Sequence, residues 1–95
     1  MRVSVKFYAT FKEITGKEII TLNLEDGATV EFLLDELFKI YGEKLKNQLI
    51  DIKTGKILKY VKILKNGRDI DFLEGLKTKL NNGDVIAFFP PIAGG

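Results

Sequence analysis

The chain opens with two runs in which apolar and polar residues alternate, 2–8 and 18–24. An alternation of period two is typical of a strand with one buried face. The positions expected to face the core are Val3, Val5, Phe7, Ile20, Leu22 and Leu24. The intervening residues carry a turn signal at Thr15 and Gly16. Two consecutive alternating runs most simply predict an antiparallel hairpin.

The strongest periodic signal lies between residues 30 and 41, where apolar residues recur with the spacing of an α-helix. The stripe consists of Val30, Leu33, Leu34, Leu37, Phe38 and Tyr41. Thr29 can cap this helix, and Gly42 sits where a left-handed cap would end it. The opposite face is acidic, which argues against a membrane-docking helix. A single stripe of this kind must pack against a sheet.

The second half of the chain alternates short predicted elements with turns. Residues 43–50 can form another helical turn or two around Leu45 and Leu49, and residues 51–59 form an excursion that turns at Thr54 and Gly55. Residues 60–65 predict a strand with Val61 inward. This strand is followed by an Asn-Gly turn at 66–67 and an extended return at 68–71. A loop or one-turn helix anchored by leucines at 72–80 and a turn at 82–84 come next.

The last predicted strand, 85–89, is apolar on both faces, which favours either the middle of a sheet or a face reserved for a partner. If Ile86 and Phe88 face the helix, Phe89 faces a side that no remaining segment is long enough to cover. Tyr8 joins this exposed patch if the first and last strands are neighbours. The pattern predicts an α+β domain, residues 1–90, with one main helix packed across a mixed sheet, and a flexible tail, residues 91–95.

Composition restricts the chemistry that this domain can perform. The chain has 95 residues, is 45% hydrophobic and contains no Cys and no His, which removes thiol nucleophiles, the usual zinc sites and the commonest general base. One domain of this length folds without metal or disulfides. The start lacks a signal-peptide pattern and no run of about 18 apolar residues occurs, so we expect a cytoplasmic protein without a membrane segment.

Basic residues gather in the middle of the chain, although the net charge is only +2. Between Lys39 and Arg68, nine basic side chains face two acidic ones, an excess of +7. Such a segment can meet an acidic protein surface, a phosphorylated ligand or nucleic acid. A solvated lysine-rich face is the preferred interpretation, and no nucleic-acid motif accompanies the lysines. We therefore expect no nucleic-acid partner.

The carboxylates offer no convincing acid/base pair. Asp69 and Asp71 flank a turn, and Glu31 and Asp35 lie on the outer face of the predicted helix, so ordinary solvated charge is the preferred interpretation. The internal glycines are isolated turn residues, and no phosphate-binding loop occurs. The sequence predicts no metal and no cofactor bound by the chain, and leaves open whether it counts as an enzyme.

The last residues supply the candidate functional group. The apolar strand meets Pro90 and Pro91, which cannot extend it, and the sequence ends in Gly94 and Gly95. Glycines without Cβ atoms fit a narrow channel in which a partner enzyme activates a carboxylate away from water. The domain thus looks like a substrate that presents the carboxylate of Gly95. An uninformative disordered end is the alternative.

These segments resemble the MoaD-like family of sulfur carriers, the small subunits of molybdopterin synthase, which are ubiquitin-like with a β-grasp fold. The resemblance lies in residues 82–95, in residues 5–9 and in the Asn66-Gly67 turn, and it covers essentially the whole chain. It is poorest at residues 45–59. Ala93 stands where many members have Ser or Thr.

The resemblance implies a mechanism and partners. A ubiquitin-activating-like adenylyltransferase would adenylate Gly95 with ATP, a persulfide donor would convert it to a thiocarboxylate, and the synthase large subunit would use the sulfur for the pterin precursor of molybdenum or tungsten cofactor. The alternatives are a protein modifier joined through Gly95 to lysines, or a sulfur carrier for tRNA or thiamine. The partner-binding residues implied are Tyr8, Ile70, Phe89, Pro90, Pro91, Ile92, Ala93 and Gly94.

Overall fold

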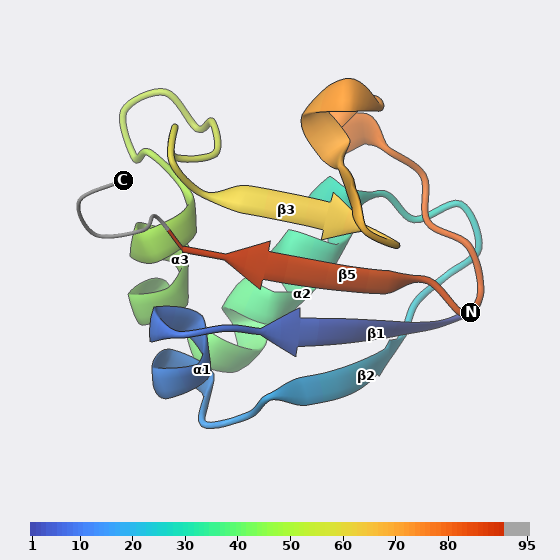
Figure 1. The fold of residues 1–95 in the computed structure, drawn as a ribbon, viewed down its shortest axis with the longest axis horizontal. Coiled ribbons are helices and arrows are strands. Elements are labelled where there is room, and N and C mark those ends of the chain that lie inside the picture. Colours follow the sequence, from blue (N-terminus) through green and yellow to red (C-terminus); the bar gives the residue numbers. More distant parts are fainter. Residues whose placement is uncertain (91–95) are drawn as a thin grey trace.

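The computed structural model describes residues 1–90, and its strands form one five-stranded sheet (Figure 1). The strands are β1 (Arg2–Phe7), β2 (Ile19–Asn23), β3 (Lys62–Lys65), β4 (Arg68–Asp69) and β5 (Val85–Phe89), in the order β2-β1-β5-β3-β4. β1 and β5 run parallel, and the other neighbouring pairs run antiparallel. The sheet is therefore mixed, and the prediction that the last strand occupies its middle is confirmed.

One long helix, α2 (Val30–Tyr41), crosses one face of the sheet, as the apolar stripe predicted (Figure 1). The Thr29 hydroxyl accepts a hydrogen bond from the amide of Phe32 at 3.3 Å and caps the first turn. Gly42 ends the helix with φ 74° and ψ −161°, a positive φ outside the left-handed helical region. The short helix α3 (Glu43–Leu49) follows at once, with Leu45 and Leu49 fully buried, as expected.

A third helix, α1 (Thr10–Thr15), lies between β1 and β2, where the sequence predicted only a turn. It buries Phe11, and Gly16 ends it in the left-handed conformation that the turn signal marked. β1 and β2 pair antiparallel with Val3 opposite Leu22, so the predicted pairing is confirmed while its connection is helical. Six residues without a side-chain cap give too weak a pattern to be recognised in sequence.

The segment between β3 and β5 leaves the sheet earlier than predicted. Asn66 and Gly67 both have positive φ, 50° and 83°, as a two-residue hairpin turn requires. β4 then ends at Asp69, and a 3₁₀ turn, η1 (Ile70–Phe72), replaces the predicted extended return; η2 (Gly75–Lys77) follows. Leu80 is buried, whereas Phe72 is exposed to solvent.

The core lies between the sheet and the three helices. Phe7 and Phe88 stack at 6.0 Å between ring centroids, and Phe11 and Tyr41 pack edge-on against this pair. Ile86 and Phe88 of β5 have no exposed surface, so the helix-facing side of the central strand is the one predicted. In residues 1–90, no helix has the length and apolar character needed to cross a membrane.

Candidate partner-docking site

Two aromatic side chains stack on the outer face of the sheet, opposite α2. In the parallel register Phe7 lies beside Phe88, so the next residues of the two strands, Tyr8 and Phe89, are also neighbours. Their ring centroids are 4.4 Å apart and their planes differ by 10°. The expectation that Tyr8 and Phe89 meet through adjacent first and last strands is confirmed.

The stacked pair belongs to a larger apolar surface, which we call the aromatic patch. It consists of Tyr8, Ile19, Ala87 and Phe89, and Lys6 lies between Ile19 and Ala87 in the pairing of β2, β1 and β5. Tyr8 is 39% exposed and Ile19 is 51% exposed, while Ala87 and Phe89 are half-buried. Sequence reasoning missed Ile19, although the inward phase of Ile20 on the same strand already placed its neighbour outward. Accessible apolar side chains gathered on one sheet face are typical of an interaction site.

A hollow of about 460 Å³ lies beside Tyr8 and gives the aromatic patch a charged rim. Lys6, Lys12, Glu18 and Ile19 contribute to its lining. The Lys12 Nζ atom donates a hydrogen bond of 2.7 Å to Glu18 Oε1. This hydrogen bond and the lysine charge lower the pKa of the Glu18 carboxyl below its ordinary 4.5, so the carboxyl is ionised at neutral pH. The stacked rings of Tyr8 and Phe89 with polar side chains around them match the anatomy of protein interfaces.

Ile70 does not belong to this surface, contrary to the prediction. Its side chain is 1% exposed and forms part of the hydrophobic core. The pairing of Leu64 with Asp69 puts the next residue, Ile70, in phase with buried Ile63 on the core side of the sheet. Asp69 caps η1, which begins at Ile70 and keeps the side chain in the core. The resemblance alone assigned Ile70 to the docking surface, and the register contradicts that assignment.

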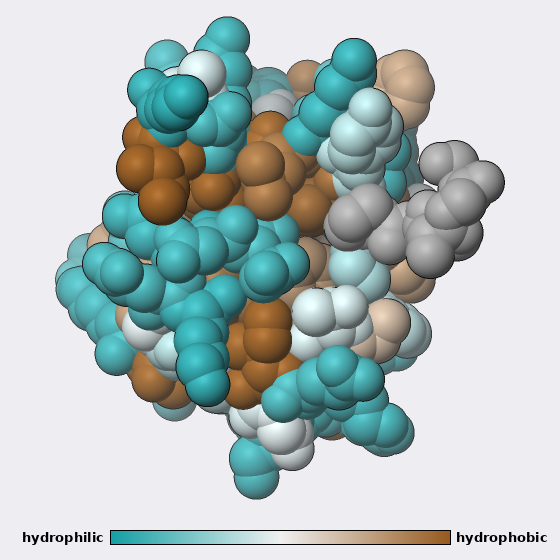
Figure 2. Space-filling model, turned by 90° about the vertical axis from the view of Figure 1, so that its left-hand side faces the viewer, coloured by the Kyte–Doolittle hydropathy of each residue, from teal (hydrophilic) through white to brown (hydrophobic). Residues whose placement is uncertain are grey.

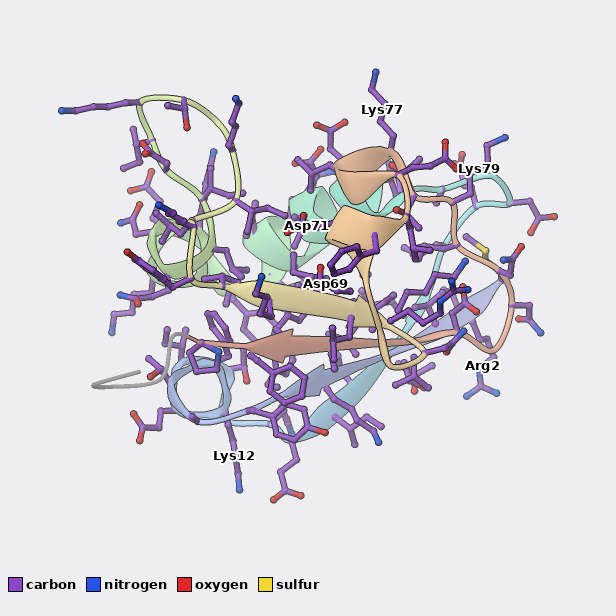
Figure 3. All side chains as sticks on the ribbon, turned by 45° about the horizontal axis from the view of Figure 1, so that its top comes forward. Arg2, Lys12, Asp69, Asp71, Lys77 and Lys79 are labelled. Atoms are coloured by element: carbon purple, nitrogen blue, oxygen red, sulfur yellow. The ribbon has the colours of Figure 1, made fainter. Side chains whose placement is uncertain are left out.

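Two acidic residues in the part of the chain that the structure describes, Asp69 and Asp84, serve structural roles. Asp69 accepts a hydrogen bond from the Asp71 amide at 2.9 Å and lies 3.5 Å from the Lys62 ammonium (Figure 3). Buried Asp84 accepts hydrogen bonds from the Asn66 side chain and the Asn81 amide, which tie β5 to the preceding turns. No group of three His, Cys, Asp or Glu in this part of the chain is placed to hold a metal ion.

The remaining predicted site residues lie outside the described part of the chain: Pro91, Ile92, Ala93, Gly94 and Gly95. What the structure establishes is where they attach. β5 runs toward the end of the sheet at which Tyr8 stacks on Phe89, and Pro90 follows β5 there. The roles assigned to these five residues, and the division into a domain and a flexible tail, stay predictions.

The similarity to known proteins extends over essentially the whole chain. The model of the ThiS family matches residues 5–95. Small archaeal modifier protein 3 of Haloferax volcanii is 39% identical over 95 residues and covers 100% of both chains. The molybdopterin synthase sulfur carrier subunit of Haemophilus influenzae is 31% identical, over 98% of this chain and 99% of its own. The crystal structure of SAMP1 from Haloferax volcanii has a TM-score of 0.86 at 25% identity, with 100% of both chains covered.

Proposed function

Because the chain belongs to the ThiS family of ubiquitin-like β-grasp proteins, we propose that it is a sulfur carrier activated at the carboxylate of Gly95. The observation that carries the proposal is the placement of the aromatic patch. It lies where β5 passes into the Pro-Pro-Ile-Ala-Gly-Gly sequence at 90–95. A partner protein that binds the aromatic patch is thereby positioned to accept the last residues of the chain in its active site.

The proposed chemistry is carried out on this chain by other proteins. An adenylyltransferase of the ubiquitin-activating type binds ATP, the Gly95 carboxylate attacks the α-phosphorus, and pyrophosphate leaves. The terminal sulfur of an enzyme persulfide then attacks the acyl carbon and AMP leaves. A second thiol reduces the resulting acyl disulfide, which gives the thiocarboxylate and a new disulfide between the two thiols. The chain itself binds no ATP, and its slender glycines enter the active sites.

For the acceptor of the sulfur, we propose the pterin precursor of molybdenum or tungsten cofactor. In this role the chain is the small subunit of molybdopterin synthase, and the large subunit takes up the last residues. Support comes from the relative in Haemophilus influenzae, which is named a molybdopterin synthase sulfur carrier subunit. The Phe-Pro-Pro sequence at 89–91 favours this acceptor over tRNA or thiamine precursors.

A second function is favoured by a separate observation, the 39% identity to small archaeal modifier protein 3 over all 95 residues. A lysine ε-amine of another protein attacks the Gly95 acyl-adenylate, AMP leaves, and an isopeptide bond forms. Both functions use the same first step. They differ only in the nucleophile that meets the activated carboxylate.

The test of activation is an intact mass measurement. The purified chain is incubated with the adenylyltransferase of its own genome, ATP and a persulfide source. The expected mass gain corresponds to one sulfur replacing one oxygen. A chain lacking Gly95 should keep its melting temperature and show no gain. An unchanged mass with an enzyme proven active on another carrier contradicts the proposal.

An experiment in the native cell distinguishes the two proposed functions. Peptides of cellular proteins are searched by mass spectrometry for lysines that carry a remnant of this chain's last residues. Such lysines support conjugation. Their absence, together with reconstitution of pterin sulfuration by the thiocarboxylate and the synthase large subunit, assigns the chain to the synthase alone.

A further inference from the structure

One stretch of the sequence is purely basic. Residues 52–68 contain no Asp or Glu and six positive charges. These are Lys53, Lys56, Lys59, Lys62, Lys65 and Arg68. Lys62 and Lys65 form ion pairs with Asp69 and Asp84, at 3.5 and 3.6 Å. Lys53, Lys56 and Lys59 are exposed, and no ion pair joins them to another residue of 1–90.

These three lysines stand on an ordered excursion, residues 51–61, which we call the basic loop. Residues 51–56 of the loop are closed by a bridge between Ile50 and Ile57 and by the Leu58 amide, which donates a hydrogen bond to the Leu49 carbonyl at 2.8 Å. Asp51 is the single carboxylate of the loop, and it accepts the Lys53 amide at 2.8 Å. The loop thus presents its positive charge from a backbone held by hydrogen bonds.

The basic loop also has an apolar side. A groove of about 410 Å³ lies between it and the end of α3, and its lining combines the apolar residues Ile57, Leu58 and Val61 with Lys56, Lys59 and Asp51. Tyr60, at 67% exposed, and Ile52, at 76% exposed, add apolar surface that nothing in residues 1–90 covers. Figure 2 shows this end of the molecule, with brown apolar surface framed by teal hydrophilic side chains.

The basic loop is continuous with the aromatic patch. Lys62 follows the loop directly and lies opposite Phe89 in the β3–β5 ladder. In Figure 1 the loop between α3 and β3 lies at the end of the sheet toward which β5 points. A protein that covers the aromatic patch and accepts the last residues of the chain therefore comes to lie beside the loop.

We propose that the basic loop binds an acidic surface of the adenylyltransferase that activates Gly95, and that an apolar side chain of this enzyme occupies the groove. The inference rests on the proposed function, because the aromatic patch brings that enzyme to this end of the sheet. Three positive charges without partners in residues 1–90 attract the acidic surface from a distance, and the groove adds contact area once the enzyme is bound.

The surface fits a protein better than a nucleic acid. Sites for single-stranded nucleic acid combine positive charge with aromatic residues on which bases stack. Tyr60 is the single aromatic residue between positions 43 and 71. An apolar groove bordered by lysines instead suits an acidic segment that carries an apolar side chain.

The test is ATP–pyrophosphate exchange by the purified adenylyltransferase of the same genome at varied concentrations of this chain. The triple variant Lys53→Glu, Lys56→Glu, Lys59→Glu should raise KM for the chain roughly tenfold at low salt and leave kcat unchanged, because the variant weakens encounter and docking but not chemistry. The difference should shrink as salt rises.

The matched control places the same charge change elsewhere. Arg2→Glu, Lys77→Glu, Lys79→Glu alters exposed side chains that lie toward the opposite end of the sheet from α3 (Figure 3). This variant should raise KM much less than the loop variant, by about twofold at most, since its charges lie toward the opposite end of the sheet from the proposed contact and make no direct contact with the enzyme there. A melting curve for each variant, and the milder Lys→Gln triple, confirm that folding is intact.

Each outcome of the pyrophosphate-exchange test either supports or contradicts the proposed binding site. An equal rise in KM for both triples assigns the effect to net charge and overturns a specific site. A wild-type KM for the loop variant also overturns it, including the case in which that variant loses affinity for purified tRNA instead. If the wild-type chain supports no exchange, the proposed function fails first and this inference fails with it.

Discussion

Phe88 and Phe89 are adjacent in the sequence and opposite in their surroundings. Phe88 is fully buried and packs against Phe7 and Phe11, with centroids 6.0 and 6.3 Å away. Phe89 points to the other face of β5, where the ring stacks on Tyr8 and stays half-buried. Because side chains alternate along a strand, one strand supplies the centre of the core and the centre of the candidate docking surface. A substitution of Phe88 should therefore change mainly stability, and a substitution of the adjacent Phe89 should change mainly partner binding.

The largest effect is expected at the buried ring. Phe88→Ala should lower the free energy of unfolding by about 3–5 kcal/mol, because the ring is lost and the close-packed neighbours fill the cavity incompletely. Urea denaturation at neutral pH measures the loss. A loss below about 1 kcal/mol contradicts the burial of Phe88 and removes the contrast with its neighbour.

Phe89→Lys should show the reverse behaviour. The free energy of unfolding should fall by about 1 kcal/mol, the value of one stacked aromatic pair, because the lysine stem can lie along the same surface. Pyrophosphate exchange with the adenylyltransferase should lose affinity strongly, since a charge replaces the centre of the aromatic patch. A stability loss as large as that of Phe88→Ala instead places Phe89 in the core.

The contrast between the two rings was accessible to sequence reasoning because it depends on simple periods. The stripe of α2 fixed which face of the sheet is covered, and the alternation through 85–89 then assigned Ile86 and Phe88 to the core. The alternation of the first strand placed Tyr8 on the outer face, as a partner of Phe89 if the first and last strands are neighbours, and the family resemblance implied the same residue. Both inferences use patterns that extend over several residues and that backbone geometry enforces.

The predictions from sequence were wrong where the local backbone conformation departs from the periodic pattern of the element. Ile70 was assigned to the docking surface by resemblance alone, whereas it follows the Leu64–Asp69 pair, lies in phase with buried Ile63 and is itself buried in the Asp69-capped turn η1. Helix α1 begins after Ala9, which has φ 49° and ψ −121°. No sequence pattern predicts this conformation for a residue with a Cβ atom. Such features depend on tertiary contacts that act on one or two residues. Ile19 differs, because the alternation of β2 already implies an outward side chain at this position.

Ala9 gives a smaller, opposite effect. Its backbone lies in a region that glycine adopts freely, and the Phe11 amide closes the turn on the Tyr8 carbonyl at 3.1 Å. Ala9→Gly should relieve strain of about 1–3 kcal/mol and lose about 0.4–1 kcal/mol through the more flexible unfolded chain. We expect a small net gain in the free energy of unfolding, measured by urea denaturation. A net loss would show that the turn is unstrained; Ala28→Gly, at a buried position with ordinary φ, is the destabilising control.

The smallest effect concerns the charged rim beside Tyr8. Hydrogen bonding from Lys12 lowers the pKa of Glu18 below 4.5 in the folded chain, so the ion pair stabilises the fold above pH 4.5 and loses this contribution as the pH falls through the lowered folded pKa. The difference in melting temperature between wild type and Glu18→Gln should therefore be small at neutral pH and vanish in acid. The deficit of Phe88→Ala should persist over the same pH range, because burial of an apolar ring involves no proton. A Glu18→Gln deficit that grows toward acid would contradict the assignment and assign the carboxyl a different partner.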